Sequence, residues 1–81
     1  MYRLVNGKAE ALEFLADNKM PFIHVPLKEL NIDKDCLIAV IVRGNKVLVP
    51  FGNDTIESGD SVVIISKRTG ISTLDEVIHL R

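Results

Sequence analysis

A pair of short apolar runs, joined by three polar residues and a glycine, narrows the choice of folds more than any other part of the chain. Leu37–Val42 and Val47–Val49 consist mainly of β-branched residues, and Arg43–Lys46 lies between them. This pattern is typical of a tight β-hairpin, in which Gly44 supplies the positive φ of a type II′ turn or Asn45 tolerates the left-handed geometry of a type I′ turn. Because the first run is apolar throughout, we expect both faces of its strand to be covered.

A further strand and two turns follow the hairpin. Asp60–Ser66 contains four consecutive β-branched residues and predicts a short, mostly buried strand. Phe51–Asp54 and Glu57–Asp60 combine glycine with asparagine, aspartate or serine, which is typical of turns. The second half of the chain is therefore expected to be rich in β-structure up to Ser66.

Two segments carry helix signals. Pro26–Leu30 has the pattern of a single helical turn that begins at a proline and stops at Asn31. Near the end of the chain, Ser72–Asp75 matches a capping pattern, with Ser72 as acceptor for the exposed amides. A terminal helix is predicted from about Thr73 to Leu80, because apolar residues recur there at helical spacing, namely Ile71, Leu74, Val77 and Ile78.

The segment Ala9–Ala16 has two interpretations. It is rich in good helix formers, and propensity alone favours a helix. Its alternation also fits a strand, with Leu12, Phe14 and Ala16 on one face and Glu13 on the other. The residues by themselves leave both alternatives open.

The length of the chain, 81 residues, predicts one domain that spans residues 1–81. A domain of this size buries a limited share of its surface, and it is marginal without a disulfide, a metal or a partner chain. Cys36 is the single cysteine, so an intramolecular disulfide is excluded. A bound metal or a second chain therefore remains as the additional source of stability for this small core.

Charge and composition exclude several classes of partner. Ten basic and eleven acidic residues give a net charge of −1, which provides no footprint for nucleic acid or an anionic membrane. Tryptophan is absent, so base-stacking platforms are not expected. Leu37–Val42 is about a third of the length of a membrane span, and no signal peptide is evident. We expect a cytoplasmic domain without membrane insertion.

The residue pattern supports neither catalysis nor metal binding. His24 and His79 are far apart in the sequence, and Cys36 has no close basic neighbour except Lys34, so no activated nucleophile is evident. A structural zinc site needs three or four Cys or His ligands at short spacings, and Asn53–Asp60 lacks the alternating oxygen ligands of a calcium loop. We therefore expect no enzyme and no metal, which leaves a second copy of the chain to complete the fold.

Arg43 and Lys46 face each other across the predicted hairpin, where like charges are unfavourable. One interpretation is a pair that contacts an anion, such as a phosphate or an acidic surface. The other is a solvated hairpin tip whose charges oppose edge-to-edge aggregation. Exposed charges mostly stay solvated, which favours the second interpretation.

With these elements placed, the chain resembles the TrkA-C domain, also called RCK-C, the carboxy-terminal ligand-binding domain of TrkA-type regulators of potassium uptake. The resemblance covers essentially the whole chain and is most specific where Gly52–Asp60 runs into Val62–Ile65. The other segments that carry it are Arg3–Val5 with Ala9–Phe14, Val25–Leu30, Leu37–Gly44 and Lys46–Pro50.

The resemblance implies an α/β (α+β) fold, with a small, mostly antiparallel β-sheet, a β-hairpin and flanking short helices. It also implies that Ala9–Ala16 is a strand and that the domain forms a homodimer. The function it implies is regulatory: ligand sensing in a Trk-type potassium uptake system, which gates or assembles with a membrane potassium transporter subunit at the inner face of the membrane. The alternative is a purely structural dimerisation module without a ligand of its own.

No cofactor is expected on this domain. In such regulators NAD belongs to a Rossmann domain that precedes the TrkA-C domain, and these 81 residues contain no G-x-G-x-x-G motif. Met1 then marks either a cut within a longer regulator, of which this is the carboxy-terminal part, or an isolated copy of the domain.

Ile23, His24, Pro26 and Leu27 are the candidate ligand-binding residues. They lie in the apolar segment Met20–Leu27, whose two prolines exclude a long regular element. In related domains that bind cyclic di-AMP, this region lines the pocket between two protomers. The resemblance thus implies a cyclic dinucleotide whose phosphate meets His24 and whose base packs on the apolar side chains. Alternatively, these residues only complete the fold or the dimer contact.

Overall fold

A five-stranded antiparallel sheet is the main element of the computed structural model, which describes residues 1–81. Its strands lie in the order β1-β2-β6-β4-β5, with the bounds Tyr2–Leu4, Ala9–Leu15, Ser61–Ser66, Cys36–Arg43 and Lys46–Leu48. A second, two-stranded sheet pairs β3 (Leu30–Ile32) with β7 (Ile78–Leu80). The mostly antiparallel sheet agrees with the expected fold class.

Helical structure is limited to two single 3₁₀ turns, η1 (Leu27–Glu29) and η2 (Leu74–Glu76). No helix in the structure has both the length and the hydropathy needed to cross a lipid bilayer. The flanking short helices that the resemblance implied are thus reduced to one turn each.

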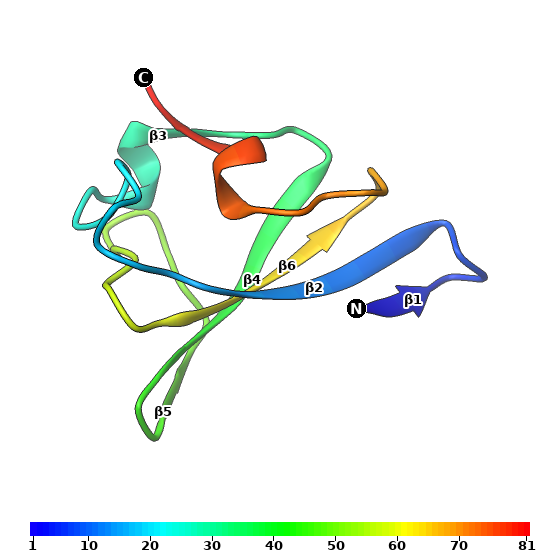
Figure 1. Ribbon diagram of the computed structural model, residues 1–81, viewed down its shortest axis with the longest axis horizontal. Helices are drawn as coiled ribbons and strands as arrows, with labels where there is room; N and C mark the ends of the chain where they lie inside the picture. Colours follow the sequence, from blue (N-terminus) through cyan, green and yellow to red (C-terminus); the bar gives the residue numbers. More distant parts are fainter.

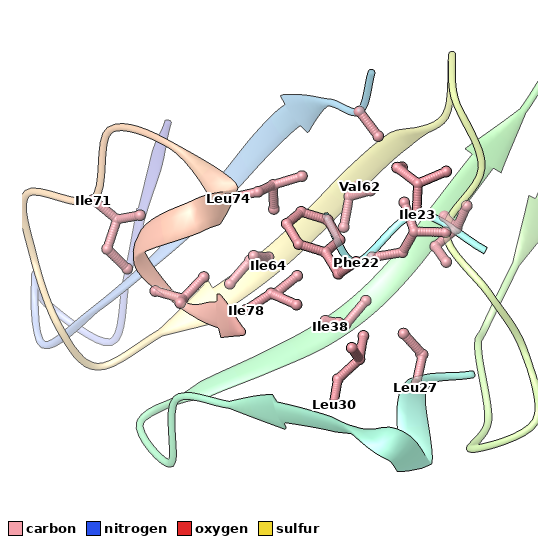
Figure 2. Close-up of a cluster of buried hydrophobic side chains, with 14 residues drawn as sticks. Phe22, Ile23, Leu27, Leu30, Ile38, Val62, Ile64, Ile71, Leu74 and Ile78 are labelled. Atoms are coloured by element: carbon pink, nitrogen blue, oxygen red, sulfur yellow. The ribbon is translucent and has the colours of Figure 1, made fainter. Parts of the chain in front are cut away.

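The hydrophobic core lies on one side of the five-stranded sheet. Both 3₁₀ turns and the β3–β7 pair lie on this side (Figure 1). Phe22, which has no exposed surface, lies in the middle of the buried cluster (Figure 2). The other members of the cluster include Ile64 of β6, Leu74 of η2 and Ile78 of β7. These contacts hold the small covering elements on the sheet without any long helix.

β2 is the strand that the resemblance implied, not the helix that propensity favoured. Six of its residues pair with β6, and β1 pairs along part of its other edge. The expected inward face is confirmed, because Leu12 and Ala16 are buried and Phe14 is half-buried. Hydrogen bonding to neighbours on both edges, which sequence propensity does not describe, outweighs the helix preference of these residues.

β4 and β5 form the predicted hairpin, with Arg43 opposite Lys46. Gly44 has a φ of 60°, whereas Asn45 is not among the residues with positive φ. A positive φ at the first loop position alone fits a type II′ turn, so this alternative is favoured over type I′. Glycine is the residue that adopts this conformation without a steric cost.

The expectation that both faces of β4 are covered is wrong. Ile38 and Ile41 point into the core and are almost completely buried, whereas Leu37 on the opposite face is 61% exposed. A register shift between Ile38 and Val40 places a bulge in the pairing with β6. The covering elements lie on the side of Ile38 and Ile41, so the other face of β4 is less buried, with Leu37 exposed and Val40 and Val42 half-buried.

The predicted terminal helix from Thr73 to Leu80 is also wrong. Only η2 is helical, and the chain then continues as β7. The N-cap is Thr73 and not Ser72, and Thr73 forms a capping box with Glu76. The helical spacing nevertheless identified four buried side chains, those of Ile71, Leu74, Val77 and Ile78. Pairing with β3 satisfies backbone groups that a longer helix would have satisfied internally.

The shorter predicted elements are confirmed with small changes of bounds. Pro26 directly precedes η1, and the turn ends at Leu30, where β3 begins, one residue before the predicted stop at Asn31. The two predicted turns close through backbone hydrogen bonds, from the Asp54 amide to the Phe51 carbonyl at 3.0 Å and from the Asp60 amide to the Glu57 carbonyl at 3.1 Å. The strand predicted after them is β6.

Candidate functional site

A cleft of about 360 Å³ opens between η1, the turn that leads into β4 and the segment that follows β5. Its size lies within the range of small-molecule pockets, roughly 300–1,000 Å³. Six of its eleven lining residues are hydrophobic, and Lys28, Asp33 and Lys34 contribute charge. The largest apolar side chains of the lining are those of Leu27, Ile32, Leu37, Ile38 and Phe51.

Backbone hydrogen bonds join two walls of this cleft. The Lys28 amide donates to the Gly52 carbonyl and the Leu27 amide to the Asp54 carbonyl, both at 2.9 Å. At Gly52 the two segments approach so closely that an added Cβ would lie 3.2 Å from the Lys28 Cβ. An added Cβ at Gly52 would require the Lys28 side chain to shift by a few tenths of an ångström, so the glycine allows the close approach of the two segments.

The charged groups of the cleft favour an anionic ligand. Lys28 and Lys34 contribute two ammonium groups, and Asp33 contributes the single carboxylate. The Asp35 amide donates to Asp33 Oδ1 at 2.8 Å, and Arg68 Nη1 donates to Asp33 Oδ2 at 2.6 Å. The hydrogen bond from the Asp35 amide is the main cause that lowers the pKa of Asp33. The hydrogen bond and the positive charge of Arg68 lower it further. Because its carboxylate is already paired, the lysines determine the charge that a ligand meets.

Residues 11–79 match the family model of the TrkA-C domain. The chain belongs to the TrkA-C family. The resemblance noted in the sequence is thereby confirmed over 69 of its 81 positions, the part that runs from within β2 into β7.

Relatives of this TrkA-C domain include three potassium uptake proteins. The chain is 32% identical over 69 residues to Trk system potassium uptake protein TrkA homolog 1 of Methanosarcina mazei, with 85% of the chain and 15% of the relative covered. It is 41% identical over 53 residues to the TrkA homolog of Archaeoglobus fulgidus, with 65% of the chain and 12% of that relative covered. It is 27% identical over 60 residues to Trk system potassium uptake protein TrkA of Mycobacterium tuberculosis, with 74% of the chain and 27% of that relative covered. The chain thus spans only 12% to 27% of the length of these relatives.

The structure separates the four residues that were predicted to bind a ligand. Leu27 lines the cleft, and Pro26 precedes it at the start of η1. Ile23 is 8% exposed and belongs to the hydrophobic core. The segment is irregular, as its prolines indicated, yet Phe22 and Ile23 are buried. Ligand binding by these four residues stays a prediction, and Leu27 alone lies at the cleft of the TrkA-C domain.

His24 is exposed but not free of contacts. Its Nδ1 lies 2.7 Å from Glu57 Oε1, and Thr55 Oγ1 donates to Oε2 of the same carboxylate. The Thr55 hydrogen bond, followed by the charge of His24, lowers the pKa of Glu57. A phosphate that used His24 would therefore compete with a carboxylate of the same chain.

Arg43 and Lys46 differ in their surroundings although they are opposite each other. Arg43 Nε and Nη2 donate to the two oxygens of Asp60, and Nη2 also donates to the Thr55 carbonyl at 3.0 Å. Lys46 is exposed at the hairpin tip. The anion contact predicted for this pair stays a prediction, and at Arg43 the Nε and Nη2 donors are already used within the chain.

Asp60 is 1% exposed, and its surroundings keep it charged. Burial alone would raise the pKa of Asp60, but hydrogen bonds from Arg43 and from the Glu57 amide outweigh burial and lower it. The Asp60 carboxylate conversely raises the pKa of Arg43. This pair is a structural connection between β4 and the turn that precedes β6.

Cys36 lines the cleft as a half-buried thiol. Its Sγ donates to Ser66 Oγ at 3.3 Å, and the Ser66 hydroxyl donates to the Arg68 carbonyl at 2.8 Å. No group of three or more His, Cys, Asp or Glu side chains is placed to hold a metal ion. These contacts connect the first residue of β4 to the end of β6 and the segment after it.

Sequence reasoning missed most of the cleft. Asp33 and Lys34 lie in the turn before β4, and Phe51 lies in a segment that was predicted only as a turn. One available signal was the order Pro50-Phe51-Gly52, which places an aromatic residue between two residues that interrupt regular structure. Phe51 is 77% exposed, which agrees with a position in a surface turn between a proline and a glycine.

Proposed function

We propose that this TrkA-C domain is a non-catalytic, ligand-binding regulatory part of a Trk-type potassium uptake system. The printed names of its relatives, each a Trk system potassium uptake protein, support this role. Since the chain spans a small part of those relatives, the domain acts within a longer regulator. That regulator assembles with a membrane potassium transporter subunit at the inner face of the membrane.

The cleft beside η1 is the observation that carries this proposal. Its apolar side chains, among them Leu27 and Phe51, suit a flat, weakly polar group such as a nucleobase. Lys28 and Lys34 suit a phosphate next to that group. A cyclic dinucleotide combines both chemistries and is the ligand class we propose, with no additional cofactor on this domain.

The cleft has an exposed apolar mouth, which favours a paired state of the domain. Leu37 and Phe51 line the cleft and are 61% and 77% exposed. A second protomer against these side chains would remove them from water and would close the site around a ligand. The regulatory unit that we propose is therefore a homodimer with the ligand between its protomers.

Regulation then follows from the different affinity of the ligand for two arrangements of the protomers. A ligand shifts such an equilibrium only by the difference in its binding free energies. Couplings of about 1–3 kcal/mol are typical, so a modest rearrangement at the cleft is enough to change the state of a transporter.

Isothermal titration calorimetry tests the proposed function. The chain is titrated with cyclic di-AMP, cyclic di-GMP, AMP and ATP, and we expect saturable binding of a cyclic dinucleotide. Lys34→Ala should weaken this binding roughly 10-fold, the loss expected for one charge-assisted hydrogen bond. Lys8→Ala, which removes an exposed lysine of the β1–β2 turn, is the matched control and should bind as the native chain does.

Two results would contradict the proposal. Absence of saturable binding across the whole panel would favour the alternative of a structural dimerisation module without a ligand. Equal losses for Lys34→Ala and Lys8→Ala would show that the binding depends on overall charge and not on the cleft.

A further inference from the structure

The outer edge of β2 is only partly paired. β1 pairs with residues 9–11 of β2, whereas β6 pairs with residues 10–15 along the other edge. Figure 1 shows β1 beside the first part of β2 alone. Residues 12–15 therefore have a strand neighbour on one edge and none on the other, and we call this second, unpaired edge the free edge.

The backbone groups of Glu13 and Leu15 point outward at the free edge. In an antiparallel strand the amide and the carbonyl of one residue point to the same edge, and successive residues alternate between the two edges. The Ala16 amide donates to the Asp60 carbonyl at 2.8 Å, and the Ala16 carbonyl accepts from the Gly59 amide at 2.9 Å, so Ala16 points to the β6 side. Glu13 and Leu15 point the other way, where no backbone hydrogen bond reaches them.

The side chains at the free edge form an apolar surface with one negative charge. Side chains alternate between the faces of a strand, so Glu13 and Leu15 lie on the side of the sheet opposite the core. Leu15 is 67% exposed, and Tyr2 of β1 is 77% exposed. A pocket of about 210 Å³ lies here, lined by Met1, Tyr2, Ala11, Leu12, Glu13 and Val63. Glu13 is the only charged side chain of this lining.

The free edge lacks most of the features that protect a strand edge from other chains. Such features are lysine, proline, a bulge or a covering segment. Residues 12–15 contain neither lysine nor proline, and β2 pairs with β6 without a register shift. The carboxylate of Glu13 opposes pairing with an acidic strand, but it favours a strand that places a positive charge opposite. The free edge therefore selects for a basic partner.

We propose that the free edge binds an extended segment of another protein as an additional strand, with a lysine or arginine opposite Glu13. Strand addition takes its affinity from main-chain hydrogen bonds and its specificity from alternate side chains. An antiparallel partner in line with β1 would exchange two hydrogen bonds with Glu13 and two with Leu15. This surface goes beyond the proposed function, since its pocket shares no lining residue with the cleft.

The direction of β2 sets the order of residues in the partner. An antiparallel segment meets Leu15 first and Glu13 two residues later, so its pattern is an apolar residue, any residue, and a lysine or arginine. The apolar residue covers the exposed side chain of Leu15. The cation reaches the pocket beside Tyr2, where its alkyl stem packs on apolar side chains and the aromatic ring attracts its charge. Because β1 occupies the edge from Ala11 onward, the partner ends or turns away after the cation.

An NMR titration of the ¹⁵N-labelled chain with the peptide acetyl-Ser-Ile-Thr-Lys-amide tests the proposal. The peptide places isoleucine opposite Leu15 and lysine opposite Glu13. We expect saturable shifts of both amides, with a Kd of about 1 mM or below, and slower hydrogen exchange of both when the peptide is bound. Leu15→Pro removes a donor that faces solvent, which a strand edge tolerates, and it should weaken binding roughly 5-fold.

A charge exchange tests the role of Glu13. Glu13→Lys should weaken binding of the lysine peptide roughly 5-fold, and the same peptide with glutamate in place of lysine should bind this variant better than it binds the native chain. Glu29→Lys makes the same charge change at an exposed position of η1, away from the free edge, and should bind the lysine peptide as the native chain does. The amide spectrum checks that each variant folds, and the Glu13→Lys comparison carries the test if Leu15→Pro does not fold.

Four results would overturn the proposal. One is the absence of saturable shifts at about 5 mM peptide, where a site with a Kd of 1 mM is mostly occupied. Another is shifts confined to the cleft, at Lys28 or Gly52. A third is equal weakening by Glu13→Lys and Glu29→Lys. The last is slow exchange of the Glu13 and Leu15 amides in the chain alone, which would show an edge that is already paired. None of these results bears on nucleotide binding in the cleft, which calorimetry tests separately.

Discussion

Asp60 accepts hydrogen bonds from Arg43 through both carboxylate oxygens, from Nε at 2.9 Å and from Nη2 at 2.8 Å. The two residues are 17 positions apart, one at the end of β4 and the other directly before β6. Because Asp60 is almost completely buried, its charge depends on this pair. The ion pair therefore connects the hairpin end to the turn before β6, beside the hydrogen bond from Arg43 Nη2 to the Thr55 carbonyl.

Asp60→Asn should lower the free energy of unfolding by about 1–2 kcal/mol, because it removes the charge-assisted hydrogen bonds from Arg43, whose side chain is 41% exposed and keeps part of its hydration. Urea unfolding followed by circular dichroism measures this change. Asp75→Asn, an exposed aspartate of η2, is the control and should change stability by less than about 0.5 kcal/mol. Equal stability of the two variants would show that the buried pair contributes nothing.

Acid should destabilise the domain. The folded structure lowers the pKa of Asp33, Glu57, Asp60 and Glu76 below their ordinary values of 3.8 and 4.5. For Glu76, the amides of Ser72 and Thr73 are the main cause. The unfolded chain thus binds more protons near these values, so stability is complete above them and is lost as the pH falls through the folded pKa values.

Urea midpoints between pH 7 and pH 2 measure this dependence. Asp60→Asn removes one of the four carboxyls and should give a shallower decline than the native chain. A midpoint that stays constant or rises as the pH falls from 5 to 3 would contradict the lowered pKa values.

Phe22→Ala should cost about 3–5 kcal/mol of stability, because it removes a completely buried aromatic ring from the core. Phe51→Ala is a matched control of the same residue type at 77% exposure and should cost less than about 0.5 kcal/mol. Thermal unfolding compares the two. A larger loss for Phe51→Ala would place the principal packing of the domain at the cleft and not in the core.

Gly44→Ala should destabilise the hairpin by about 1–2 kcal/mol, because φ is 60° at this position. Asn45→Ala changes the neighbouring loop residue, which lacks a positive φ, and should cost less. Chemical denaturation of both variants makes the comparison. An equal effect at the two positions would argue against the type II′ turn.

Local patterns predicted the elements whose structure depends on near neighbours. The turn at Gly44, the strand that became β6 and the burial of Leu74 and Val77 all follow from spacing and turn chemistry within a few residues. Ala9–Ala16 could not be decided in this way, because its strand state comes from pairing with β6, about 50 positions away.

The incorrect or missing predictions have the same cause, namely contacts between residues that are far apart in the sequence. The segment after η2 became β7 because β3 offers a strand partner from the other half of the chain. The cleft combines the turn before β4 with residues after β5, so Asp33 and Phe51 carry no shared signal in the sequence. From the sequence, Arg43 was interpreted as a solvated charge at a hairpin tip. In the fold it forms hydrogen bonds with Asp60, which lies 17 positions further along the chain.

The most direct test of ligand binding by the cleft is a titration of the ¹⁵N-labelled chain with cyclic di-AMP, followed by amide chemical shifts. We predict saturable shifts for the amides of Lys28, Asp33 and Gly52, which line the cleft, and none for Gly7 in the β1–β2 turn. Absence of saturable shifts up to about 1 mM, the weak limit of specific binding, or shifts confined to residues outside the cleft, would contradict it.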